Sequence, residues 1–335
     1  MPTRRLTLLI EDKDDKILSS IQNNENIIQY WMSPKLKGQP REVNILAASD
    51  EMQDLVDKLQ QKCAQEESWR MIISPVETTI PRPEKKEEEE ETPKAKKTYG
   101  TMTREALYDQ IMKGAETNID FMILVALSTV VAAIGLITNN IAVIIGAMVI
   151  APLLGPNLAL SLGVTLGDRN LIVKALQANA VGVGLTLIIS IIFALFVPYD
   201  NFSDSQEYLS RTTAGYGGIA LAMASGAAAA LSLTAGISSA MVGVMVAVAL
   251  MPPAVVLGLS LGAGAFEHAY GAMLLLAINV ISINISTKIV FMLKGIKPRT
   301  WYQRKKSEQS LKISAILWGV LLLILMILIY LWQYR

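Results

Sequence analysis

The chain has 335 residues, and its 30 Lys and Arg residues nearly balance its 29 Asp and Glu residues. Only 12 of these charges lie between residues 116 and 295, and uncharged runs span 121–167, 175–199, 212–266, 268–287 and 313–334. Soluble domains interrupt their apolar segments with charged faces, so these runs exclude an ordinary soluble enzyme. The apolar content also excludes a disordered protein, and the balanced charge excludes a nucleic-acid binder that relies on a basic surface.

Histidine and cysteine occur once each, as His268 and Cys63. A disulfide within the chain and a Cys/His zinc site therefore cannot form. A catalytic triad or dyad with histidine would have to use His268, which follows Glu267 in a predicted loop. The sequence thus predicts no catalytic residue, no metal site and no cofactor, and we expect a protein that is not an enzyme.

Residues 1–80 are predicted to form a small soluble α+β domain. The order β-α-β-β-α-β is typical of the ferredoxin-like fold. Domains of this shape often bind regulatory ligands or pair edge to edge, which favours an assembly or regulatory role over catalysis. The expected strands are Arg4–Ile10, Ile27–Met32, Val43–Ala48 and Trp69–Val76, and the expected helices are Lys16–Gln22 and Glu51–Cys63.

A charged linker is expected at residues 81–100, where prolines flank the acidic run Glu87–Glu91 and several lysines follow. This composition indicates a solvated tether, although the lysines could also lie against an anionic membrane surface. Residues 101–116 follow as an amphipathic segment, in which apolar residues recur at helical spacing over Arg104–Gly114. We expect this segment to be an interfacial helix.

Seven membrane crossings are predicted, because a spanning helix needs roughly 20 residues. The uncharged runs 121–167 and 212–266 are each long enough for two crossings, divided at Thr138–Asn140 and near Gly236–Ser239. Three further crossings complete the set, at Leu171–Val197, Ala269–Leu293 and Ile313–Trp332, the last within a C-terminal segment at 311–334.

Positive charge orients these crossings. The loop Lys294–Lys312 is rich in Lys and Arg and is expected to face the cytoplasm, whereas the loop Tyr199–Thr212 is acidic and is expected outside. An odd number of crossings then places the N-terminal domain in the cytoplasm. We expect a multi-pass protein of the inner or plasma membrane.

An internal repeat relates residues 117–198 to residues 213–294. Without a gap, Gly146–Leu162 aligns with Gly243–Leu259 at a spacing of 97 residues. Each repeat holds three crossings, so the second copy enters the membrane from the opposite side. Such 3+3 inverted repeats are found in many secondary transporters, with substrate sites near the middle of the bilayer on interrupted helices. A duplicated scaffold that transports nothing is the alternative.

Prolines and amides near the middle of the crossings mark a candidate solute pathway. Prolines are predicted to interrupt the second and fifth crossings, which frees backbone carbonyls in an apolar environment. Asn179 and Asn279 match each other after a further shift of three residues. Interhelical hydrogen bonding and simple helix kinks are the alternatives. The candidate residues are Pro152, Pro156, Asn157, Asn179, Pro252, Pro253, Asn279 and Ser282.

Four membrane segments resemble a known family: IGAMVIAPLLGPNLALSLGVTLGD (145–168), SGAAAALSL (225–233), VAVALMPPAVVLGLSLGAG (246–264) and GAMLLLAINVISINI (271–285). They are similar to the prokaryotic membrane proteins of the "uncharacterized hydrophobic domain" family, as is VETTIPRPE (76–84) near the end of the soluble domain. The likeness covers about residues 1–295. It implies a prokaryotic membrane protein of this architecture and carries over no functional residue.

The leading hypothesis is a polytopic transporter or channel for a small ion or polar solute, with a cytoplasmic regulatory or assembly domain. No Asp, Glu or His lies in the middle of a crossing, so the solute would meet amides, hydroxyls and backbone groups. The alternative is a membrane sensor or scaffold whose soluble domain binds a ligand or partner. The expected partners are the lipid bilayer, the solute and further copies of the chain in a homo-oligomer.

Overall fold

The computed structural model describes residues 3–10, 27–34, 40–63, 69–77, 79, 102–236 and 239–296, with isolated helical positions between 319 and 330; at 239–248 only the backbone is described. The chain divides into two compact units, Met1–Arg104 and Glu105–Arg335. Four predicted segments lie wholly or mostly outside the described residues: Lys16–Gln22, the linker 81–100, the loop Lys294–Lys312 and the crossing Ile313–Trp332.

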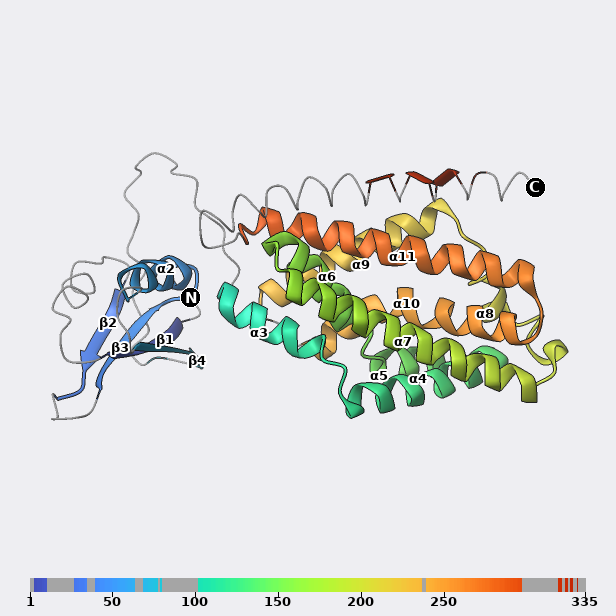
Figure 1. The fold of residues 1–335 in the computed structure, drawn as a ribbon, viewed down its shortest axis with the longest axis horizontal. Helices are drawn as coiled ribbons and strands as arrows, with labels where there is room; N and C mark the ends of the chain where they lie inside the picture. The colour runs from blue at the N-terminus through green and yellow to red at the C-terminus, as the bar shows by residue number, and fades with distance from the viewer. Residues whose placement is uncertain are drawn as a thin grey trace. The chain divides into compact units, whose positions relative to one another are not determined.

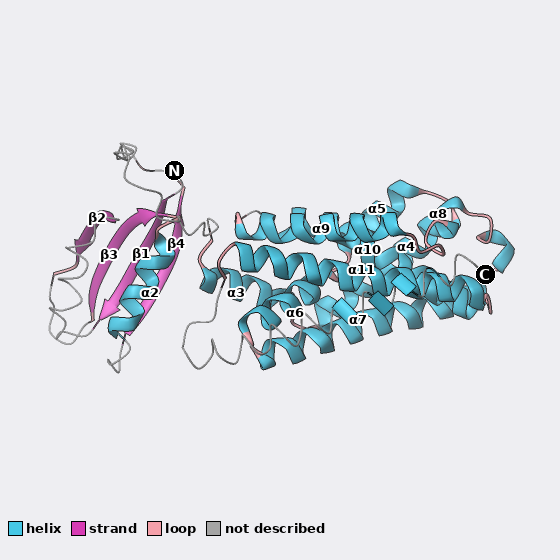
Figure 2. Ribbon diagram, turned by 90° about the horizontal axis from the view of Figure 1, so that it is seen from above, coloured by secondary structure: helices cyan, strands magenta, loops and turns pink. Residues whose placement is uncertain are grey.

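The first unit contains a four-stranded antiparallel sheet in the order β2-β3-β1-β4 (Figure 1). This order is that of the ferredoxin-like fold, so the predicted strands are confirmed. Helix α2 covers one face of the sheet (Figure 2). The bounds are β1 Thr3–Ile10, β2 Ile27–Met32, β3 Arg41–Ala48, α2 Met52–Cys63 and β4 Trp69–Val76.

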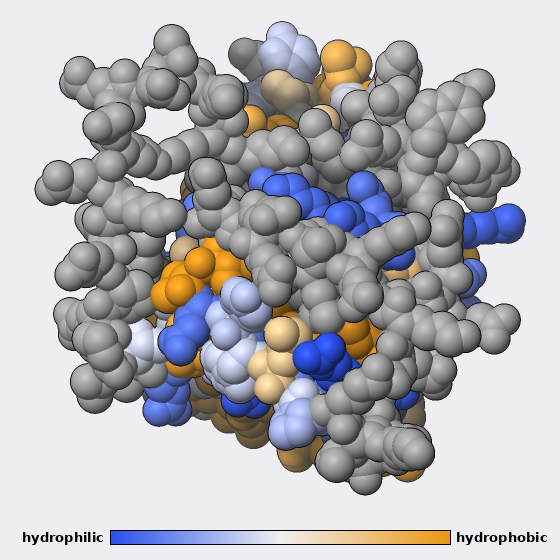
Figure 3. Space-filling model, turned by 90° about the vertical axis from the view of Figure 1, so that its left-hand side faces the viewer, coloured by the Kyte–Doolittle hydropathy of each residue, from blue (hydrophilic) through white to orange (hydrophobic). Residues whose placement is uncertain are grey.

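The two faces of this sheet differ. On the side of α2, Leu6, Leu8 and Ile45 pack with apolar residues of the helix into a closed core. On the opposite side, one row across the strands pairs exposed Trp31 with Asn44, and Asn44 in turn with Thr7. In Figure 3, hydrophilic and hydrophobic residues lie beside each other between the residues drawn in grey.

The helices of the second unit run side by side in both ribbon views (Figures 1 and 2). Among the described residues, four helices are long and apolar enough to cross a membrane, namely α4, α7, α9 and α11. Helices α5 and α6 together make a fifth candidate span, bent by 51°. The bounds are α3 Arg104–Gly114, α4 Ile119–Ile137, α5 Ile141–Ile150, α6 Leu154–Leu166, α7 Arg169–Phe196, η1 Tyr199–Asn201, α8 Gln206–Leu209, α9 Tyr216–Thr234, α10 Ser239–Gly262 and α11 Phe266–Leu293.

Side-chain caps explain several of these helix starts. The side chain of Asn140 accepts hydrogen bonds from the amides of Ala142 and Val143, which begins α5 directly after the predicted division at Thr138–Asn140. Asp168 caps α7 in the same way, and its carboxylate also accepts a 2.7 Å hydrogen bond from the Tyr108 hydroxyl of α3. These caps fix where each helix enters the bundle.

Two pairs of helices have the same lengths and the same separation in the sequence. Helices α4 and α9 each have 19 residues and start 97 positions apart, at Ile119 and Tyr216. Helices α7 and α11 each have 28 residues and start 97 positions apart, at Arg169 and Phe266. Residues with a positive φ angle follow the same spacing, at Asn139 and Gly236 and again at Gly167 and Gly264. The spacing therefore holds along the whole segment without a shift.

Burial separates two central helices from the helices around them. Helix α6 and the part of α10 from Ala249 to Ser260 are buried on nearly every side. Helix α7 buries only a narrow stripe of mostly small residues and exposes large apolar side chains such as Ile188 and Leu195. Apolar side chains on the outside of a helix bundle are expected where lipid surrounds it.

Candidate solute-binding cavity

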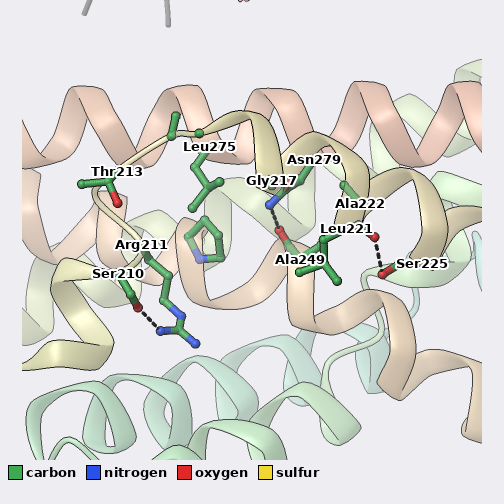
Figure 4. A pocket seen from close by; sticks show the side chains of 14 residues that line it. Ser210, Arg211, Thr213, Gly217, Leu221, Ala222, Ser225, Ala249, Leu275 and Asn279 are labelled. Atoms are coloured by element: carbon green, nitrogen blue, oxygen red, sulfur yellow. Dashed lines mark hydrogen bonds between the residues drawn. The ribbon is translucent and has the colours of Figure 1, made fainter. Parts of the chain in front are cut away.

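A cavity of about 510 Å³ lies between α9, α10, α11 and the segment that precedes α9 (Figure 4). It begins at this segment and reaches Ser225 halfway along α9 and Asn279 halfway along α11. At a rise of 1.5 Å per residue, the first half of α9 gives the cavity a length of roughly 15 Å along this helix. Its lining comprises Ser210, Arg211, Thr213, Ala214, Gly215, Gly217, Gly218, Leu221, Ala222, Ser225, Ala249, Pro253, Leu275 and Asn279.

Small residues on α9 create the hollow. A side chain placed on Gly218 would meet nothing closer than the Leu275 Cδ1 atom, at 3.5 Å from the added Cβ. Gly217 faces open space, and Ala222 and Ser225 follow on the same helix. The cavity exists because these positions lack the large side chains that would fill it.

Asn279 meets a backbone carbonyl that a proline leaves without its helical partner. Pro253 has no N–H to donate to the carbonyl of Ala249 one turn earlier. The Asn279 Nδ2 atom donates to that carbonyl oxygen at 2.7 Å, at the inner end of the cavity (Figure 4). With this bond from a neighbouring helix, α10 continues through Pro252 and Pro253. The prediction that these two prolines interrupt the helix is therefore wrong.

A cationic side chain lies at the other end of the cavity. The Arg211 guanidinium forms an ion pair of 2.7 Å with the Glu207 carboxylate and is only 18% exposed. It also donates to the Glu207 carbonyl oxygen at 2.8 Å. Among the described residues, the lining contains this one cation and no carboxylate, together with the Ser225 hydroxyl and the Asn279 amide. Such a lining suits a small polar or anionic solute.

The prolines of the first repeat act differently. The chain leaves α5 at Ile150 and resumes as α6 at Leu154, so Pro152 lies in the break that bends this pair by 51°. Pro156 lies in the first turn of α6, where a missing N–H breaks no helical hydrogen bond. The predicted interruption at Pro152 is confirmed, and the one at Pro156 is wrong.

Buried amides connect α6, α7 and α11 in a chain of hydrogen bonds. Ser161 Oγ donates to Asn284 Oδ1 at 2.8 Å, and Asn284 Nδ2 donates to Asn157 Oδ1 at 3.2 Å. Asn157 Nδ2 then donates to Asn179 Oδ1 at 2.9 Å, and Asn179 Nδ2 donates to the Ala175 carbonyl. Each amide in this chain has both an acceptor role and a donor role. Asn157 and Asn179 thus join helices, and neither lines the cavity.

The two asparagines of the predicted pair do not occupy matched positions. Because α7 and α11 start 97 residues apart, the residue that matches Asn279 is Gly182, and the residue that matches Asn179 is Leu276. The three-residue shift that paired the asparagines is therefore wrong. The sequence between the proline segments and these helices is apolar in both repeats. It therefore contains no distinctive residue that could exclude the shift.

Ser282 lies one turn beyond Asn279 on α11 and is fully buried. Its hydroxyl has no hydrogen-bond partner within the described residues. It does not line the cavity.

Of the eight residues predicted for the pathway, the structure brings Pro253 and Asn279 to the cavity. It adds Arg211 and the glycines of α9, which sequence reasoning missed.

A second polar cluster lies outside the cavity lining, where α11 begins. His268 is in the first turn of α11 and not in a loop, which corrects the prediction. Its Nδ1 atom is 2.8 Å from the Tyr199 hydroxyl, and the Tyr208 hydroxyl is 2.7 Å from Ser260 Oγ. Burial raises the pKa of Tyr208 to about 12, so this phenol stays neutral at physiological pH.

Comparison with known proteins identifies the family. The family described as Domain of unknown function (DUF389) matches residues 148–285. Over 299 residues, the chain is 33% identical to an uncharacterized protein of Methanocaldococcus jannaschii. This match covers 89% of the chain and 90% of that relative. No solved structure matches the chain. As its sequence motifs indicated, the chain belongs to this family of unknown function.

Proposed function

We propose that this protein is an integral membrane transporter or channel for a small polar or anionic solute. The observation that carries the proposal is the cavity, which reaches the middle of three apolar helices and presents polar groups along its length. A guanidinium, a hydroxyl and an amide lie in it, on Arg211, Ser225 and Asn279. Polar groups lining a cavity at this depth in lipid are expected where a solute passes.

The proposal places seven crossings in the inner or plasma membrane of a prokaryote. Four helices and the bent pair α5–α6 supply five of them. Helix α10, with 24 residues, is taken as the sixth, and the apolar stretch Ile313–Trp332 as the seventh. The Lys- and Arg-rich loop between α11 and that stretch then lies in the cytoplasm together with the N-terminal unit. The cavity opens toward the outside.

Matching contacts support an inverted repeat of three crossings each. In the first repeat Thr129 of α4 bonds Thr186 of α7, and 97 residues later Gly226 of α9 lies against Ile283 of α11. Contacts between the repeats correspond as well: Ser161 bonds Asn284, and their counterparts are Gly258 and Leu187, which also touch. These contact pairs agree with a two-fold relation between the halves. Because three is odd, that relation inverts the second half in the membrane.

The soluble unit is proposed to regulate or assemble the protein as a homo-oligomer. Trp31 and Ile72 lie at the two ends of one row across the open sheet face and are 43% and 48% exposed. Exposed aromatic and aliphatic side chains beside buried polar ones are typical of a surface that binds a partner. The competing proposal is a sensor whose soluble unit binds a ligand and which moves no solute. The exposed Trp31 and Ile72 side chains favour this alternative as well.

Flux measured in proteoliposomes tests the proposal. Purified protein is reconstituted, and stopped-flow light scattering follows the volume recovery after osmotic shocks with chloride, nitrate, phosphate, formate, glycerol or urea. We expect at least one of these solutes to enter faster than into protein-free liposomes. Equal rates for all of them would contradict transport and favour the sensor.

Two asparagine variants assign the site in the same assay. Asn279→Ala removes a side chain that lines the cavity, and we expect its flux to fall about tenfold. Asn179→Ala removes an amide of the same type that does not line the cavity, and it should retain most of the flux. Equal losses in both variants would show that the cavity is not the pathway.

A further inference from the structure

The first repeat contains a counterpart of the cavity. At the spacing of 97 residues, Ser128 of α4 matches Ser225 of α9, and Gly182 of α7 matches Asn279 of α11. Ser225 lines the cavity, whereas Ser128 is fully buried. The same helix positions therefore surround open space in one repeat and closed packing in the other.

An aromatic ring and a leucine side chain occupy this space in the first repeat. Phe121 of α4 occupies the position of Gly218 in the second repeat and is only 4% exposed. A Cβ atom on Gly182 would lie 3.3 Å from the Phe121 Cζ atom and 2.7 Å from the Leu153 Cδ2 atom. The ring and Leu153 thus converge on Gly182 and fill the space that matches the inner end of the cavity.

We propose that the first repeat holds the second half of the solute pathway, between α4, α6 and α7, and that Phe121 closes it in this structure. The inference rests on the proposed function. It adds a site on the cytoplasmic side, because Phe121 lies in the first turn of α4 and α4 begins on the side assigned to the N-terminal unit. The two half-pathways would take the same small polar or anionic solute.

Cysteine accessibility tests this closure. In a Cys63→Ala background, Ser128→Cys places a thiol in the closed half. Inside-out membrane vesicles are treated with a membrane-impermeant cationic methanethiosulfonate, which reacts only with thiols that water reaches. We expect slow modification with Phe121 present and modification faster by about tenfold after Phe121→Ala or Phe121→Val, because either change removes the ring.

Two control variants separate closure from general loosening. Phe121→Leu keeps a large apolar side chain and should leave the thiol protected. Phe291→Ala removes a fully buried ring elsewhere on α11 and should also leave it protected. Folding of each variant is checked by size-exclusion chromatography in detergent, where a single peak at the wild-type volume is expected. Unchanged protection in both folded Phe121 variants would overturn the inference, as would equal exposure in the Phe291 control.

The outcome is distinguishable from failure of the proposed function. Labelling reports whether water enters the first repeat and requires no transport. Faster labelling of Ser128→Cys without flux of any solute would support closure of the first repeat by Phe121 and reject transport. If the protein conducts a solute but the Ser128→Cys thiol stays protected in the Phe121 variants, transport is supported and the route between α4, α6 and α7 is rejected.

Discussion

Two pairs of helices in the second unit, α4 with α9 and α7 with α11, have matching lengths, but the spaces beside them differ. Around α10, small residues of α9 leave a cavity that reaches the middle of the bundle. Around α6, the ring of Phe121 fills the matching space. Since the sequence spacing is the same, we attribute the difference to side-chain volume, above all at positions 121 and 218.

The prolines show the same contrast. Pro152 ends α5 in a bent break, whereas α10 continues through Pro252 and Pro253. The Asn279 amide bonds the carbonyl that Pro253 leaves free, and Gly182 at the matching position has no side chain with which to do so. At Pro253, a donor from the neighbouring helix thus satisfies the freed carbonyl where the helix stays continuous.

The largest expected effect comes from giving the second repeat the residue of the first. Gly218→Phe would place a ring in the cavity, because the added Cβ meets only Leu275 Cδ1 at 3.5 Å. We expect solute flux to fall by about tenfold or more, since a pathway conducts according to its width. Gly184→Phe makes the same exchange where nothing lies within 4 Å and should conduct normally. A conducting Gly218 variant would break the comparison.

A second prediction concerns the close contact of α10 with α7. A Cβ on Gly258 would lie 2.4 Å from the Ser190 Cβ atom and 3.1 Å from the Leu187 carbonyl oxygen. Gly258→Ala should therefore lower the free energy of unfolding by about 3 kcal/mol, measured by chemical denaturation in detergent. Gly146→Ala, at a position with nothing within 4 Å, serves as the control. Equal stability of the two variants would contradict the packing of the repeats.

The buried amide chain gives a smaller effect. Asn284→Ala removes the side-chain acceptor of Ser161 and the amide that donates to the buried Asn157 Oδ1 atom. We expect a loss of about 2 kcal/mol in the same unfolding measurement. Ser225→Ala removes a hydroxyl that donates to the Leu221 carbonyl of its own helix and should change stability little. If Asn284→Ala were as stable as wild type, the amides would not join the repeats.

The smallest effect is expected at the start of the membrane unit. Burial, followed by the hydrogen bond to Asp168, raises the pKa of Tyr108 to about 12. The neutral phenol thus donates throughout the physiological range, and stability from this contact declines only as pH rises past the ordinary tyrosine value. Tyr108→Phe should cost about 1 kcal/mol at neutral pH, because the pair is partly exposed. A larger loss at pH 6 than at pH 8 would contradict a neutral donor.

Elements with a clear local pattern could be predicted from the sequence. Strands β2 and β4 and helix α3 have the predicted bounds, because their apolar spacing and flanking residues define them locally. The continuity of α10 could not be predicted, since it depends on Asn279 from another helix. The cavity could not be predicted for a related reason. It is empty space beside Gly217 and Gly218, and such space depends on how the neighbouring helices pack. The sequence identifies Asn157 and Asn179 as polar residues within apolar helices, but only the fold shows that they form a hydrogen bond with each other.

Thiol labelling of Ser225→Cys tests the central claim most directly. The claim is that the second repeat holds the open half of a solute pathway that faces the outside. In a Cys63→Ala background, right-side-out vesicles treated with the impermeant methanethiosulfonate should label this cysteine rapidly, and Gly218→Phe should slow the reaction by about tenfold. Labelling that is absent from outside, or that Gly218→Phe leaves unchanged, would contradict the account.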